Sequence, residues 1–166
     1  MSQLIQAFIN ATDAEGNTAR INIAKITRIE GRCPPKEYDK DDGNRSSLRS
    51  AEAKWITRET PEDIYERVLC AQQEHLKKLK ATRLINQDSL MSFNVFARFR
   101  DDDDCVNYIP TNSIIRMDDE YSLVGVITQH HGRIECLDSL KELDTEIESA
   151  ERTHIKMLQK YTLGIK

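Results

Sequence analysis

The chain has 166 residues, of which 39% are hydrophobic and 31% are charged, and its formal net charge is -4. This composition can bury a core, which excludes a disordered or fibrous chain. The negative charge argues against an extended nucleic-acid surface, because phosphate binding concentrates Lys and Arg on one face. The sequence has no apolar run of about 18 residues and no secretion signal, so we expect a cytoplasmic protein without a membrane span.

The first part of the chain predicts a series of strands. Apolar and polar residues alternate over residues 4–10, and the turn-forming segment Asp-Ala-Glu-Gly-Asn follows. Further strands are expected over residues 18–23, 26–30 and 54–57. The intervening residues 31–52 contain two prolines, a charged run and several serines, which predicts one long loop.

A helix is predicted after these strands. Thr60 is a typical N-cap, Pro61 stands where its missing N–H is harmless, and two acids follow at the positive end of the helix. Apolar residues at helical spacing extend the prediction to about Ala81.

The second part of the chain follows the same order. Alternation begins again at Ser92, with Phe93 as its first apolar residue, and Asp101 to Asp104 form a turn. A second helix is expected after Ser139, which forms a capping box with Glu142, and Gly164 is its expected stop. The strands between turn and helix are predicted over residues 106–109, 113–117, 122–128 and 133–137.

The two parts align with each other. Residues 21–30 match residues 109–118 at one constant offset, which places Arg28 opposite Arg116. One short sheet with one helix buries too little surface to be stable alone, whereas two such units can share a core. The sequence therefore predicts an α+β fold of two pseudo-repeated antiparallel β-sheet units, each followed by a long amphipathic helix, over residues 1–82 and 91–166.

The second unit carries a family resemblance. Residues 107–117, with Ile109 and Ile114 at their core, are followed by Gly132 in a hairpin and by Asp138 and Ser139 at a helix start. This pattern resembles the small FlbD-like family of flagellar-associated proteins, as an internally duplicated form. The resemblance implies a regulatory role. The duplication, the 31–52 loop and the long helices depart from the family's pattern.

Arginines supply the candidate ligand site. Arg28 and Arg116 occupy equivalent positions, and Arg98 and Arg100 share one face of a predicted strand with Phe96. A guanidinium group can grip phosphate with two hydrogen bonds, and an aromatic ring can stack on a base. These five residues could therefore bind an anionic small molecule such as a signalling nucleotide; the alternative is ordinary charge on a strand surface.

Other polar clusters have simpler interpretations. His130 and His131 could ligate a metal or could be a solvated hairpin tip, and Asp101 to Asp104 could bind a cation or form a charged turn. The basic stretch from Lys77 to Arg83 could contact nucleic acid or face solvent. No catalytic motif is visible, so we expect no enzyme activity, no cofactor and no bound metal.

The four cysteines are widely spaced and form no Cys-x-x-Cys pair, which is typical neither of a zinc ribbon nor of a secreted disulfide framework. We therefore expect reduced thiols at Cys33, Cys70, Cys105 and Cys136, the second and fourth partly buried.

These observations favour a non-enzymatic binding or regulatory protein that contacts another protein or a ligand. One alternative is sequestration of an anionic small molecule, and another is a nucleic-acid-binding regulator, against which the net charge argues. Helices of about 20 residues are about 30 Å long and overreach a small sheet. We expect their distal halves to pack on each other or on a second chain, in a homo-oligomer.

Overall fold

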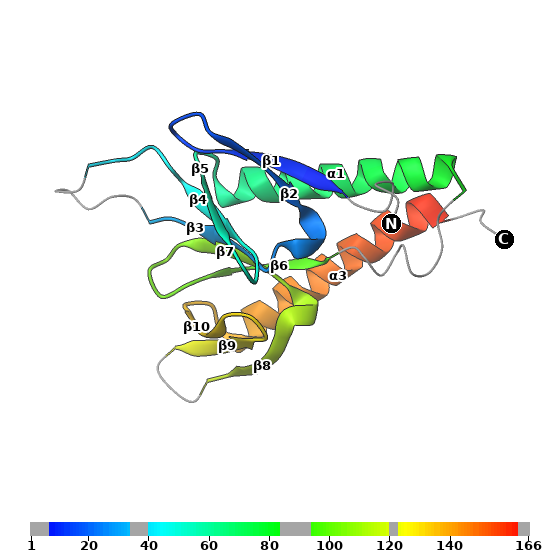
Figure 1. The fold of residues 1–166 in the computed structure, drawn as a ribbon. Helices are drawn as coiled ribbons and strands as arrows, with labels where there is room; N and C mark the ends of the chain where they lie inside the picture. The colour runs from blue at the N-terminus through cyan, green and yellow to red at the C-terminus, as the bar shows by residue number, and fades with distance from the viewer. Residues whose placement is uncertain (1–6, 34–39, 84–93, 120–122, 163–166) are drawn as a thin grey trace.

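The structure is a computed structural model that describes residues 7–33, 40–83, 94–119 and 123–162 (Figure 1). Its elements follow in chain order: β1 (Phe8–Thr12), β2 (Thr18–Asn22), the 3-10 turn η2 (Ile23–Lys25), β3 (Arg28–Gly31), β4 (Ser46–Arg49), β5 (Lys54–Thr57), α1 (Pro61–Ala81), β6 (Phe96–Arg100), β7 (Val106–Pro110), η3 (Thr111–Ser113), β8 (Ile114–Asp118), β9 (Val124–Thr128), β10 (Gly132–Cys136) and α3 (Leu140–Thr162).

The described strands form three antiparallel sheets. β1 and β2 form a two-stranded sheet, β10-β9-β8 a three-stranded sheet, and β5-β4-β3-β7-β6 a five-stranded sheet. β3 and β7 meet in the middle of the largest sheet, where Ile29 lies opposite Tyr108 and Glu30 opposite Asn107. One sheet therefore takes strands from both parts of the chain.

The predicted fold class is wrong in its architecture, although the protein is α+β. We expected two repeated sheet units, each followed by its own helix, but the strands are distributed over three sheets and the largest sheet joins the two parts. The reason is that strand alternation predicts a strand and its faces, and does not specify which distant strand pairs with it. The proposed division into residues 1–82 and 91–166 stays a prediction.

The five-stranded sheet separates two clusters of buried side chains. Phe96 and Tyr108 point into the first cluster, together with residues from β1, β2 and α1. Phe99 and Ile109 point into the second, together with residues from β9, β10 and α3. In Figure 1 the β1–β2 hairpin and α1 lie on one side of this sheet, and β8–β10 with much of α3 lie on the other.

Both helix starts confirm the predicted caps. The Thr60 hydroxyl accepts a hydrogen bond from the Asp63 N–H at 3.2 Å, and the Ser139 hydroxyl accepts one from the Glu142 N–H at 3.3 Å. The far ends of the two helices converge in Figure 1. There they pack on each other through a small buried cluster, which confirms the expected helix contact; it consists of Leu76, Leu79, Met157 and Tyr161.

The predicted loop over residues 31–52 is wrong in part, because it contains strand β4 at an inner position of the five-stranded sheet. The serines that suggested a loop are buried within it. Ser46 donates a hydrogen bond to the Glu59 carbonyl at 2.8 Å, and Ser47 donates one to the Glu30 carboxylate at 2.9 Å. Satisfied hydroxyls can be buried at little cost, which is why a polar sequence forms an inner strand here.

The cysteines do not all remain thiols. Cys33 and Cys105 form a disulfide with their Cα atoms 5.7 Å apart, so the expectation of four reduced cysteines is wrong for this pair. Cys136 is a buried thiol, and Cys70 is exposed. The spacing of the cysteines could not predict this disulfide, because the two residues are 72 positions apart in the sequence and meet only in the folded chain.

Some predicted features lie outside the described residues: the first part of the strand over residues 4–10, the alternation from Ser92 to Phe93, and the helix stop at Gly164. Neither described helix combines the length and the apolar run needed to cross a membrane.

Candidate binding groove

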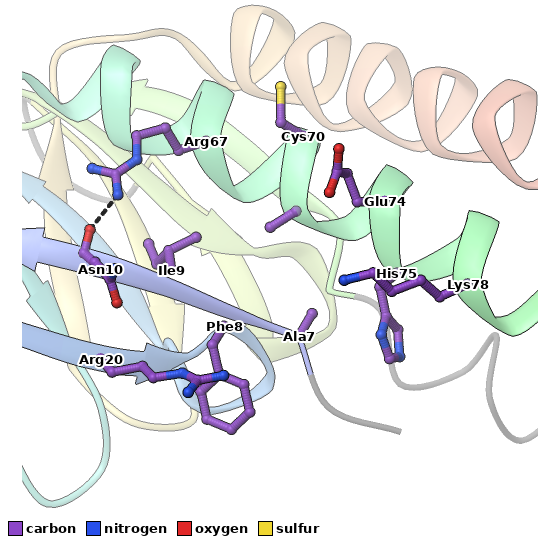
Figure 2. A pocket seen from close by; sticks show the side chains of 11 residues that line it. Ala7, Phe8, Ile9, Asn10, Arg20, Arg67, Cys70, Glu74, His75 and Lys78 are labelled. Carbon is purple, nitrogen blue, oxygen red and sulfur yellow. Dashed lines mark hydrogen bonds between the residues drawn. The ribbon is translucent and has the colours of Figure 1, made fainter. Parts of the chain in front are cut away.

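An open groove with a volume of about 690 Å³ runs between β1 and α1. Figure 2 shows its lining side chains, which come from the β1 segment, from β2 and from the face of α1 that turns toward them. The lining residues are Ala7, Phe8, Ile9, Asn10, Arg20, Arg67, Cys70, Ala71, Glu74, His75 and Lys78.

The outer edge of β1 faces this groove. The Ile23 N–H donates to the Ala7 carbonyl at 3.0 Å. In an antiparallel pair the backbone groups of alternate residues point to the partner. Ala7 bonds Ile23 of η2, Ile9 and Ala11 therefore bond to β2, and the backbone groups of Phe8, Asn10 and Thr12 point the other way.

Only part of this outer edge is satisfied. The Thr12 carbonyl accepts hydrogen bonds from the Arg58 N–H and the Thr57 hydroxyl, both at 3.0 Å. The Asn10 carbonyl accepts one from the Arg67 guanidinium group, marked in Figure 2. Within the described part of the chain, no partner strand covers the remaining outward groups, which are the N–H groups of Phe8, Asn10 and Thr12 and the Phe8 carbonyl.

Arg67 fixes one end of the groove. It projects from α1, and its Nη1 donates to both carboxylate oxygens of Glu59 while Nη2 reaches Asn10. This link ties the helix to the edge of β1. Among the described residues, the groove is therefore closed where the strand meets β5 and open toward the start of β1.

Two exposed cations lie along the open part. The Arg20 guanidinium carbon lies 4.6 Å from the centre of the Phe8 ring, which holds this cation over the strand by a cation–π contact. Figure 2 shows the Lys78 ammonium directed toward the β1 side, whereas the Glu74 carboxylate and the Cys70 sulfur point away from β1. The side of the groove next to the strand edge is thus positively charged.

The predicted arginine site is distributed over two sheets. Arg28, in the five-stranded sheet, has only 12% of its side chain exposed; it lies near Glu30 and Asp101 and donates to Asn107 at 2.8 Å. Arg116 lies on β8 in the three-stranded sheet, is 59% exposed, and pairs with Asp118.

The other three predicted residues lie on β6. Phe96 is buried against Tyr65, with ring centres 6.4 Å apart, and Arg98 lies opposite Tyr108 in the β6–β7 pairing. Arg100 bonds Asp138 at 3.0 Å. The structure brings Arg28, Phe96, Arg98 and Arg100 into one sheet and leaves Arg116 in another; a ligand pocket formed by these residues stays a prediction.

The remaining polar clusters are partly structural. The Asp101 carboxylate accepts hydrogen bonds from the Cys105 N–H and the Asn107 side chain, both at 2.8 Å, and so stabilises its own turn. His131 Nε2 lies 3.0 Å from the Thr27 hydroxyl, while His130 is exposed. Among the described residues, no group of three or more His, Cys, Asp or Glu side chains is placed to hold a metal ion.

Sequence reasoning missed the groove. It predicted the β1–β2 hairpin, but it could not show that no other described strand pairs with the second edge of β1. A weak signal was present, because polar Asn10 and basic Arg20 interrupt apolar residues in two neighbouring predicted strands. Such positions mark the exposed side of a hairpin.

Comparisons add little to this geometry. No protein-family model and no curated protein matches the chain significantly. A solved LytTr DNA-binding domain from Bacillus cereus aligns over 92% of this chain and 96% of its own, with a TM-score of 0.37 and 11% sequence identity. This likeness is below the level at which two chains share a fold.

Proposed function

We propose that this protein is a non-enzymatic binding protein that captures an extended acidic peptide segment by strand addition at β1. The observation that carries the proposal is the outer edge of β1, where the backbone groups of Phe8 and Asn10 face an open groove. An uncovered strand edge is a template for pairing with another extended chain. Peptide-binding domains use such edges, because main-chain hydrogen bonds supply affinity and neighbouring side chains supply specificity.

The positive side chains beside the edge of β1 favour an acidic peptide. Arg20 and Lys78 flank the open part of the edge, and the Glu74 carboxylate points away from it in Figure 2. A peptide strand alternates its side chains between two faces. Acidic residues on the face toward these cations would therefore form ion pairs while the peptide backbone bonds β1.

The length of the usable edge limits the peptide. Arg67 and the contacts of Thr12 occupy the carbonyl groups toward the end of β1. Pairing is therefore expected at Phe8 and Asn10 and not farther along the strand. A short segment suits this edge better than a long hairpin.

The test begins with selection of peptides from a displayed random ten-residue library on the wild-type protein, with Asn10→Pro as the counter-selection variant. Proline at this position removes an outward N–H and leaves the inward bonds of Ile9 and Ala11 to β2 intact. We expect enriched peptides to be rich in Asp and Glu and in β-branched residues. Enrichment of peptides that bind Asn10→Pro equally well would contradict strand addition.

A selected peptide is then synthesised with and without N-methyl groups at alternate residues, which leaves the protein unchanged. We expect the methylated peptide to lose binding in calorimetry and the unmethylated peptide to protect the Phe8 and Asn10 amides from hydrogen exchange.

Lys78→Glu and Lys77→Glu form a matched pair, because both lysines are exposed on α1 but only Lys78 lines the groove. Lys78→Glu is expected to weaken peptide binding about tenfold, and Lys77→Glu to leave it unchanged.

A second copy of the chain is the competing occupant. Dimerisation in sedimentation experiments that Asn10→Pro abolishes would assign the edge to this copy and overturn the peptide proposal.

A further inference from the structure

A second hollow, of about 300 Å³, lies between the β4–β5 turn and the tip of the β9–β10 hairpin. Arg49 and Lys54 line it from either side of the turn, together with the turn residues 50–53, and His130 and His131 line it from the hairpin tip. This hollow shares no lining residue with the groove beside β1.

Two cations, Arg49 and Lys54, line this hollow, and both contact a carboxylate behind it. Glu30 is an acceptor for both Arg49 and Lys54, at 2.9 and 3.1 Å, and Arg28 lies 3.6 Å from the same carboxylate. Asp101 offsets part of the Arg28 charge from 3.7 Å. Glu52 is the acid among the residues that line the hollow. One inner carboxylate is thus shared by three cationic side chains.

The titration of nearby groups agrees with a positive local field. Burial alone would raise the pKa of Glu30, but the Arg49 hydrogen bond and the Arg28 charge outweigh it and lower this pKa to about 2. Burial lowers the pKa of His131, and Arg28 and Arg49 lower it further. The contributions of Arg28 and Arg49 to both shifts have the sign expected of nearby positive charges.

The cations retain donors beyond the Glu30 contact. Arg49 uses Nε and Nη2 on this carboxylate, which leaves Nη1 for another acceptor, and its side chain is 35% exposed. Lys54 is 44% exposed and carries three donors, of which one reaches Glu30. His130 is exposed on the facing hairpin tip.

The turn that carries these donors is held in place. The Ser50 hydroxyl accepts hydrogen bonds from the N–H groups of Glu52 and Ala53, at 3.3 and 3.1 Å. The backbone between Arg49 and Lys54 is therefore fixed, and the two cations are kept at a set spacing. A preorganised site loses less conformational entropy on binding.

We propose that this hollow binds the phosphate group of a small phosphate monoester through Arg49, Lys54 and His130. A phosphate dianion offers several acceptor oxygens, and arginine with lysine is the usual pair that recognises it. Arg49 and Lys54 share the Glu30 carboxylate, so this one acceptor does not use all of their donors. The site is independent of the peptide groove, so either can fail without the other.

Thermal unfolding with three probes tests the proposal: inorganic phosphate, ribose 5-phosphate and O-phosphoserine, each against sodium chloride at equal ionic strength. A ligand of the folded state raises the melting temperature. We expect ribose 5-phosphate and O-phosphoserine both to raise it above the chloride baseline. If inorganic phosphate alone raises the melting temperature, the proposal of a phosphate-ester site is wrong. If none of the three probes raises it more than sodium chloride does, the hollow is not a phosphate site.

Variants assign the effect to the hollow. Lys54→Met and His130→Ala remove exposed donors and are each expected to weaken ester binding at least tenfold in calorimetry. Arg116→Gln is the matched control, because this exposed arginine also pairs with a strand carboxylate but does not line the hollow. Ester binding that persists in Lys54→Met and His130→Ala would contradict the assignment.

Discussion

The β1–β2 and β6–β7 hairpins have similar turns but different strand partners. In each hairpin the first Asp of the turn accepts a hydrogen bond from the N–H four residues on, at 2.8 Å: Asp13 from Asn17, and Asp101 from Cys105. Yet β7 pairs with β3 in the large sheet, while β1 pairs only with β2 among the described strands. Local sequence determines a turn, and a distant strand determines whether the hairpin is buried or leaves an edge for binding.

The largest difference is expected in the apolar side chains of the two hairpins. Phe99 of β6 is 1% exposed in the second cluster, so Phe99→Ala should lower the free energy of unfolding by about 3–5 kcal/mol. Phe8 of β1 is only half-buried beside Arg20, and Phe8→Ala should cost about 1 kcal/mol or less. Urea unfolding measures both. Equal losses would mean that the β1–β2 hairpin is as integral to the core as β6–β7.

A second difference concerns acid stability. Glu30 lies opposite Asn107 in the β3–β7 pairing, and its pKa is lowered from 4.5 to about 2. A lowered folded-state pKa stabilises the protein above pH 4.5, and this contribution is lost as the pH falls toward 2. It amounts to at most about 3 kcal/mol, because one pKa unit corresponds to about 1.4 kcal/mol.

Urea unfolding between pH 2 and 6 checks this expectation. Glu30→Gln should be less stable than the wild type at pH 6, with the gap closing toward pH 2. The pKa of Asp13, in the exposed turn of the β1–β2 hairpin, is also lowered, by the Asn17 side chain first. Asp13→Asn should change the pH profile less than Glu30→Gln; a larger change would reverse the comparison.

The smallest expected difference separates two asparagines. Asn107 of β7 is fully buried, accepts from Arg28, and donates to Asp101 and the Cys105 carbonyl, each at 2.8 Å. Asn107→Ala leaves buried polar groups without this partner and should cost about 1–3 kcal/mol. Asn10→Ala, at an exposed position of β1, should stay within about 0.5 kcal/mol of the wild type in the same urea experiment. Similar costs would show that burial of β7 adds nothing to this polar network.

Features governed by neighbouring residues could be predicted from the sequence. The Thr60 and Ser139 caps, the two helices and most strands follow from side chains within a few positions of one another. Strand β4 could not be predicted, because Ser46 and Ser47 are suited to an inner strand only once the Glu59 carbonyl and the Glu30 carboxylate accept their hydroxyl groups. The Cys33–Cys105 disulfide has the same origin in contacts between distant residues.

The candidate sites divide in the same way. Arg28 was identified from its recurrence in the sequence, but the structure places it beside Glu30, which Arg49 and Lys54 also contact. Arg49, Lys54 and Arg67 had no pattern that distinguished them from other surface cations. Their roles depend on contacts with residues that are distant in the sequence and close only in the folded protein.

By itself, the sequence determined that this chain forms hairpins with Asp-anchored turns and two capped amphipathic helices, because these depend on hydrogen bonds and apolar spacing within short segments. Only the tertiary structure decided that β3 pairs with β7 and that the outer edge of β1 faces a groove. A strand's alternation defines its two faces, whereas the partner at each edge is selected by packing against the rest of the chain.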